Sequence, residues 1–312
     1  MRNYFLVLLV LLICCSAYPK DSFFGNIEFS TGIICGTSNE YVMQHDKTIS
    51  RLDWEENWIP VISVGGQINV FNFFAGGSLN YGIPRKSGIL EDYDFLLEDS
   101  NAISHYSRHD AYLDKDFAVS IKTGYTVKVR KWQFAPAIGF LYRTRKWTGT
   151  DGYTQYPSDG GAWVGNESKQ QVIGTVICYE QSIKHVFASI KIAYTINSNF
   201  EVNLDGNFYP YIWAQSLDSH FLGAKQFYDN GMNGGIGGTI GISGLYYVNT
   251  TKNRFAVKLN VAYETIGKLK GDTASSSIGA TDAVMTNNDG FDSKMASHEW
   301  RISAVVVWVL GK

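Results

Sequence analysis

The chain has 312 residues, a formal net charge of −2 and only 18% charged residues. This length suits one large domain or two small ones, and the near-neutral charge gives no indication of nucleic acid as a partner. Aromatic residues make up 14% of the chain, and there are 31 glycines but six prolines, a composition that favours strands and turns over helices.

The N-terminal segment predicts a secretory signal. Arg2 supplies a positive charge, residues 5–13 are apolar, and Cys15-Ser16-Ala17 offers small residues for cleavage. The apolar stretch is shorter than the roughly 20 residues that a membrane-spanning helix requires. We therefore expect residues 1–17 to be a signal peptide and residues 18–312 to form one domain.

Three later segments alternate in polarity. Residues 117–127, 254–264 and 300–310 each place large apolar side chains on one parity and small or polar ones on the other. Alternation with period two predicts strands. The polar face carries Lys258 and Asn260 within a long strand, as a hydrated lumen permits, and aromatic residues lie near strand ends, as in membrane girdles. The pattern favours a membrane barrel over a soluble sandwich.

The connecting segments fall into two classes. The short ones are 69–72, 129–131, 197–199 and 249–253. The long ones are about 85–111, 150–168, 217–231 and 270–295. Short turns at one end and long loops at the other are typical of outer-membrane barrels. We expect an all-β fold, a ten-stranded antiparallel transmembrane β-barrel with long extracellular loops, whose even strand number leaves no free edge.

Cysteine and histidine spacing predicts no metal site. Cys35 and Cys178 remain after the signal, far apart in sequence, and we expect them to be unpaired. The segment Ser297-His298-Glu299-Trp300 lacks the second histidine of a metalloprotease helix. We expect neither a metal nor a resident cofactor.

Two pairs of polar residues are candidates for chemistry. Asp92 and Asp94 lie one residue apart, so an extended chain points them to the same side. Carboxylates this close repel each other, which raises one pKa and allows the pair to hold a proton or a water. Asp218 and His220 have the same spacing, and a carboxylate beside an imidazole fixes its tautomer and favours its protonated form. Taken singly, either pair is also compatible with an ordinary polar loop.

These pairs stand among motifs that resemble the omptins, the ten-stranded outer-membrane proteases of Gram-negative bacteria. The motifs, in order, are Gly32 through Gly36 to Glu40, Ser50-Arg51-Leu52-Asp53-Trp54, Asp92-Tyr93-Asp94-Phe95, Ser107-Arg108-His109 and Asp218-Ser219-His220. The similarity extends from about residue 24 to the C-terminus. It implies an endopeptidase in the outer membrane of a Gram-negative bacterium, acting on peptides or proteins at the cell surface.

The resemblance also implies a mechanism. Asp218 would orient His220, which would take a proton from a water held on its other side by Asp92 and Asp94. The water would attack the scissile carbonyl directly, with no covalent intermediate. His109 would be a substrate contact or a loop anchor, and we favour the anchor.

The substrate pocket departs from the family pattern. Omptins cut after a basic residue because acids in the pocket pair with it, and one of these acids matches Glu40. A second acid of the family falls at Ser216 here, and a third falls near His105. We therefore expect cleavage after basic residues through Glu40, without a clear preference for paired basic residues.

Omptins also bind and require lipopolysaccharide on the outer face of the barrel. A basic residue of that site falls at Ser182 in this chain. Lys184, Arg143 and Arg145 are the cations that we expect to contribute instead.

One segment conflicts with simple alternation. Val202, Leu204, Phe208 and Ile212 share the parity of lipid-facing residues, and so do Asp218 and His220. A bulge near Pro210 is required if the last two are to face the lumen.

The alternatives to a protease are a non-catalytic barrel, acting as a pore or an adhesin, and a lipid hydrolase. A lipid hydrolase requires a nucleophile motif that the sequence does not offer. Retention of Asp92, Asp94, Asp218 and His220 favours the protease over a barrel that has lost catalysis.

Overall fold

The computed structural model describes residues 23–98, 100–249, 254–278 and 286–310. The predicted signal peptide lies outside the described residues. The strands are β1 (Phe23–Gln44), β2 (Lys47–Val70), β3 (Phe73–Gly82), β4 (Arg85–Asp94), β5 (His105–Tyr125), β6 (Val127–Val129), β7 (Trp132–Gln155), β8 (Gln170–Gln171), β9 (Thr175–Thr195), β10 (Phe200–His220), β11 (Lys225–Asn233), β12 (Gly237–Asn249), β13 (Arg254–Ser277) and β14 (Thr286–Leu310). Among the described residues, no helix is long and apolar enough to cross a membrane.

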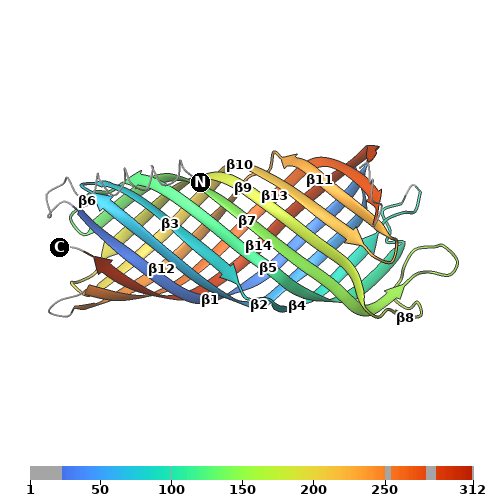
Figure 1. Ribbon diagram of the computed structural model, residues 1–312, viewed down its shortest axis with the longest axis horizontal. Helices are drawn as coiled ribbons and strands as arrows, with labels where there is room; N and C mark the ends of the chain where they lie inside the picture. Colours follow the sequence, from blue (N-terminus) through green and yellow to red (C-terminus); the bar gives the residue numbers. More distant parts are fainter. Residues whose placement is uncertain (1–22, 99, 250–253, 279–285, 311–312) are drawn as a thin grey trace.

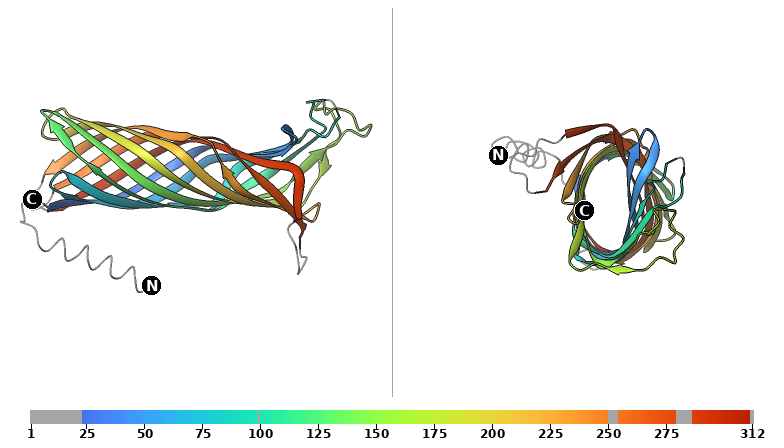
Figure 2. Two further views of the ribbon diagram at one scale, coloured as in Figure 1. Left: turned by 90° about the horizontal axis from the view of Figure 1, so that it is seen from above. Right: turned by 90° about the vertical axis from the view of Figure 1, so that its right-hand side faces the viewer.

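The strands pair in antiparallel fashion into a closed ring. β1 pairs with both β2 and β14, so the first and last strands close the sheet. Within the described residues, β3 and β4 together form one wall between β2 and β5, and β11 and β12 form another between β10 and β13. With β6 continuing the wall of β5 and β8 lying in a loop, the fourteen segments make ten walls. The predicted all-β barrel is confirmed, and the end-on view in Figure 2 shows the ring.

The outer face carries an apolar belt. Exposed aliphatic side chains cover the middle of the barrel, among them Ile62, Ile121, Ile138, Leu259 and Val306. Exposed aromatic residues lie at both margins: Phe71, Phe73, Trp132 and Trp308 near the short turns, and Trp58, Tyr81, Trp213 and Trp300 at the opposite margin. An apolar band between two aromatic girdles is the surface that a lipid bilayer requires of a barrel.

The walls continue well beyond the second girdle. Several of the predicted long loops are largely strand: β4 and β5 include most of residues 85–111, and β10 and β11 leave only a short turn between residues 220 and 225. Residues 156–168 lie outside the strands, as predicted. Figure 1 shows these extensions, with β8, at the end opposite β6. The segments predicted as loops at 85–111 and 217–231 are thus extensions of the walls, and their polar residues stand on paired strands outside the membrane belt.

A bulge in β10 resolves the conflict in parity. The β9–β10 register shifts between Phe208 and Tyr211, so that both residues face outward although they are three positions apart. Ile212 is consequently buried in the lumen. Its predicted lipid exposure is wrong, because the extra residue at the bulge reverses the parity of all that follows.

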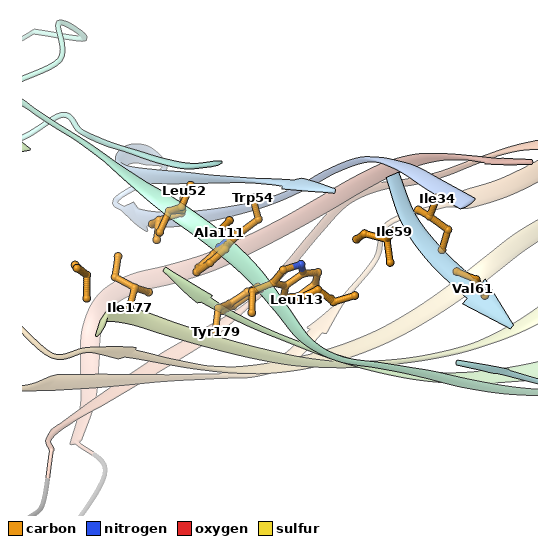
Figure 3. Packing of buried hydrophobic residues seen from close by; sticks show 12 residues of the cluster. Ile34, Leu52, Trp54, Ile59, Val61, Ala111, Leu113, Ile177 and Tyr179 are labelled. Atoms are coloured by element: carbon orange, nitrogen blue, oxygen red, sulfur yellow. The ribbon is translucent and has the colours of Figure 1, made fainter. Parts of the chain in front are cut away.

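An aromatic layer crosses the lumen beyond the membrane belt. The rings of Trp54, Trp147 and Tyr179, from β2, β7 and β9, are fully buried, with centroids 5.8–6.2 Å apart. Figure 3 shows Trp54 and Tyr179 approaching each other among buried aliphatic neighbours. We call these three rings the aromatic floor, since the polar residues of the extended walls lie directly beyond it.

A network of buried ions lies on the other side of the aromatic floor. Arg145 pairs with Glu56 at 3.0 Å and also with Glu299, and Arg143 pairs with Glu299 at 2.9 Å and with Asp116 at 2.8 Å. These residues come from four strands around the ring, β2, β5, β7 and β14. Below the network, toward the short turns, the lumen contains a polar cavity of about 360 Å³.

Candidate active site

Asp92 and Asp94 occupy the end of β4, where the wall projects beyond the membrane belt. Both belong to the same parity of an extended strand, as predicted. Asp92 is opposite Leu52, two residue pairs beyond Trp54 of the aromatic floor. Its Oδ1 accepts a hydrogen bond of 3.3 Å from the hydroxyl of Ser50. The two carboxylates therefore stand together just above the floor.

Asp218 and His220 occupy the end of β10, after the bulge. Asp218 is opposite Tyr179 of the aromatic floor and is fully buried. Its Oδ2 is in hydrogen-bond contact with Nε2 of His220. The imidazole, 27% exposed at its side chain, packs edge-on against Phe227. The predicted carboxylate–imidazole pair is thus formed, with its histidine open to the extracellular side.

The two pairs influence each other electrostatically. Burial raises the pKa of Asp92 to about 7, the charge of Asp94 adds to the rise, and the charge of His220 opposes it. Burial alone lowers the pKa of His220, but the charge and hydrogen bond of Asp218 outweigh it, with contributions from Asp92 and Asp94, and raise the pKa to about 9. Titratable groups with strongly shifted pKa values are characteristic of sites that transfer protons.

A third group of acids lies near Asp218, on β1 and β11. We refer to the region of these acids and the two pairs as the cleft. Glu40 on β1 is buried, and its pKa is raised well above the ordinary value by burial and by the charges of Asp218 and Asp229. Ser216 donates a 2.8 Å hydrogen bond to Oδ2 of Asp229, which stands opposite it on β11. Asp229 was not singled out in the sequence, because its strand lies in a segment expected to be a loop.

Two further histidines, His105 and His109, lie on β5. His109 is buried, and its ring nitrogens contact the carbonyl oxygen of Asp151 at 2.5 Å and the hydroxyl of Ser107 at 2.9 Å. Both nitrogens are thus engaged within the wall, as an anchor requires. His105, opposite Asp94, packs its ring edge-on against Tyr156 at 4.5 Å.

The cations expected on the outer face divide between two environments. Lys184 is exposed on β9, with its ammonium 5.9 Å from the ring of Tyr142. Arg143 and Arg145 instead lie in the lumen, buried in the ion network. Their predicted contact with lipopolysaccharide is therefore wrong, because odd-numbered positions of this part of β7 face inward.

The chain is similar in sequence to a known protein family and in structure to solved outer-membrane proteins. The sequence model of the Omptin family matches residues 24–301, and no curated protein sequence matches the chain. Among solved structures, the crystal structure of the outer membrane protease OmpT from Escherichia coli superimposes with a TM-score of 0.81 at 16% identity, covering 92% of this chain and 97% of that one. The translocator domain of the autotransporter NalP from Neisseria meningitidis reaches a TM-score of only 0.36 at 8% identity, covering 98% and 95%. The likeness to OmpT shows a shared fold.

Proposed function

Because the chain belongs to the omptin family, we propose that it is an endopeptidase that hydrolyses peptide bonds at the cell surface. The OmpT-like barrel and the family indicate the outer membrane of a Gram-negative bacterium as its location. The observation that carries the proposal is the hydrogen-bonded pair of Asp218 and His220, coupled in charge to Asp92 and Asp94. The cleft lies outside the membrane belt, where extracellular peptides can reach it.

In the proposed mechanism a water molecule lies between the two pairs. Asp92 and Asp94 hold the water through one of its hydrogens, and His220 accepts the other as a proton while the water oxygen attacks the scissile carbonyl carbon. Asp218 fixes the tautomer of the imidazole and stabilises the imidazolium that results. His220 then protonates the leaving amine, so that no bond to the protein forms at any stage.

The resting charge of the cleft links binding to this chemistry. With a pKa of about 9, His220 is cationic at neutral pH in the free protein. A basic substrate side chain bound near Glu40 adds a positive charge to the cleft, and like charges disfavour the cationic imidazole. Binding therefore lowers the pKa of His220 toward the range in which it accepts a proton, and cleavage after Arg or Lys follows from the same electrostatics.

Lipopolysaccharide is proposed as a lipid activator. Lys184 lies near the extracellular aromatic girdle, opposite Trp213 in the β9–β10 register. At this level the phosphates of lipopolysaccharide meet the barrel surface, and an exposed ammonium attracts them. We expect Lys184→Ala to weaken the stimulation of the refolded protein by lipopolysaccharide, measured as the lipid concentration that gives half-maximal cleavage.

A digest of a peptide library by refolded protein with lipopolysaccharide tests the main proposal. We expect cleavage after Arg and Lys by the wild type and a loss of more than about 10³-fold in rate for His220→Ala, as for removal of a catalytic base. Equal cleavage by the two proteins would contradict the protease function. Cleavage with no preference for basic residues would contradict the role of Glu40 alone.

A further inference from the structure

The base of the cleft contains three buried carboxylates but fewer cations than are needed to neutralise them. Glu40, Asp218 and Asp229 are exposed by only 1%, 0% and 3%, and they come from β1, β10 and β11. Among the described residues, His220 pairs with Asp218, whereas no Lys or Arg forms an ion pair with Glu40 or Asp229. Carboxylates are rarely this buried without a cationic partner.

Some of the buried acceptors also lack hydrogen-bond donors. Within the described part of the chain, Oε2 of Glu40 and Oδ1 of Asp218 are inaccessible to solvent and have no hydrogen-bond partner. Orphaned buried acceptors are few in native proteins and mark places where a missing group belongs. Glu40 and Asp218 also interact with each other, so one of the two must carry a proton, and a donor that is also a cation can take the place of that proton.

The carboxylate of Asp229 is held in a fixed orientation. Its Oδ2 accepts a 2.8 Å hydrogen bond from Ser216 and its Oδ1 accepts a 2.9 Å hydrogen bond from Thr273. Ser216 stands at the position where the resemblance to the family leads us to expect an acid, and Asp229 lies directly opposite it in the β10–β11 register. A carboxylate on the neighbouring strand therefore supplies the charge that the serine lacks.

We infer that Asp229 is a specificity-determining residue that, with Glu40, receives the basic side chain preceding the scissile bond. This inference rests on the proposed protease function and identifies which residues of this chain make the pocket selective. Because the two carboxylates approach from different strands, a guanidinium, with its planar fork of donors, satisfies both better than a compact ammonium. The pocket therefore favours Arg over Lys.

The test uses three peptides that differ only in the residue before the cut, which is Arg, Lys or Gln. Asp229→Asn keeps the shape of the side chain and removes its charge. At pH 8 we expect it to lower kcat/KM for the Arg peptide by about 10- to 100-fold, as for loss of one charge-assisted hydrogen bond, and to change the Gln peptide little. The matched control is Asp110→Asn, which removes a carboxylate from an exposed ion pair with Lys86 on the wall.

A charge swap separates a specific role from a structural one. Ser216→Asp combined with Asp229→Ser returns the carboxylate to β10, and we expect it to recover most of the preference for Arg over Gln. Benzamidine, a small guanidinium analogue, serves as a binding probe, and its inhibition constant should rise in Asp229→Asn and recover in the swap.

The outcomes are distinguishable. If the wild type cuts the Arg peptide and Asp229→Asn cuts it with unchanged kcat/KM, the role of Asp229 is wrong while the protease function stands. An equal fall for the Arg and Gln peptides also overturns the inference, because it marks a general loss of the site. If the wild type cuts no better than His220→Ala, the proposed function fails first.

Discussion

Two clusters of buried charge lie on either side of the aromatic floor, and they differ in balance. In the ion network, Arg143 and Arg145 share the carboxylates of Asp116, Glu56 and Glu299, so each buried acid has a cationic partner. In the cleft, Glu40 and Asp229 have none among the described residues. A balanced buried cluster is complete within the chain, whereas an unbalanced one is complete only with a ligand.

The difference separates structure from function within one lumen. The ion network joins strands from opposite sides of the ring and fills the lumen between the aromatic floor and the polar cavity below it. These ion pairs cross the lumen and tie its walls together, which is a structural role. The cleft stores unfavourable charge instead, and proteins retain such clusters where the charge serves binding or catalysis.

The largest expected effect is on the ion network, where each buried acid has a cationic partner. Arg145→Met removes the cation that faces Glu56 and Glu299, which leaves buried carboxylates short of a partner. Breaking a buried ion pair from one side costs about 3–5 kcal/mol, and we expect that loss in the unfolding free energy of the refolded barrel in detergent. The control is Lys115→Met, which removes an exposed pair with Glu180 at 3.3 Å and should cost no more than ~1 kcal/mol. Equal losses in the two variants would remove the distinction between network and surface.

In the cleft, removal of a buried charge is expected to raise the unfolding free energy instead of lowering it. Burial raises the pKa of Asp229 to about 6, above its ordinary value of 3.8, although hydrogen bonds from Ser216 and Thr273 oppose the rise. A carboxyl with a raised folded-state pKa destabilises the fold when ionised, so the penalty is full above pH 6 and disappears as the pH falls through 3.8. Asp229→Asn should therefore stabilise the protein by on the order of 1–3 kcal/mol at pH 8.

The pH dependence gives this prediction its control. At pH 4 the stabilisation by Asp229→Asn should be nearly absent, because the wild-type carboxyl is then largely protonated in the folded state. Unfolding midpoints of the wild type and the variant, measured at both pH values, check the difference. A variant that is less stable at pH 8 would show that Asp229 belongs to the structural framework, as the acids of the network do.

Much of this arrangement could be predicted from local patterns. Alternation in residues 117–127, 254–264 and 300–310 correctly assigned the lipid face, and the spacing of Asp92 with Asp94 and of Asp218 with His220 correctly placed each pair on one side of a strand. The inward direction of Arg143 and Arg145 was also available, since Phe134, Ile138 and Phe140 have the other parity and are exposed. Alternation on this strand therefore predicts the inward direction of both arginines.

The pocket acid could not be found in the same way. Asp229 becomes part of the cleft because β11 forms and pairs with β10 in a register that sets it against Ser216, and register across a turn is a non-local property. The bulge after Phe208 was inferred only because the function required it. Pro210, which cannot donate a ladder hydrogen bond, is the local signal that marks the site.

The smallest expected effect concerns the pKa of His220. It tests how much the excess negative charge of the cleft raises that pKa. Asp218 contributes most of what raises the pKa of His220 to about 9, so Asp218→Asn should lower this pKa by about one to two units. The acidic limb of kcat/KM reports the free protein, and we expect it to move to lower pH in the variant while the maximal rate falls. Asp110→Asn, whose carboxylate lies outside the cleft, should leave the limb in place. If Asp218→Asn leaves it in place too, His220 is not the group whose deprotonation starts the reaction, and the base must be sought in Asp92 and Asp94.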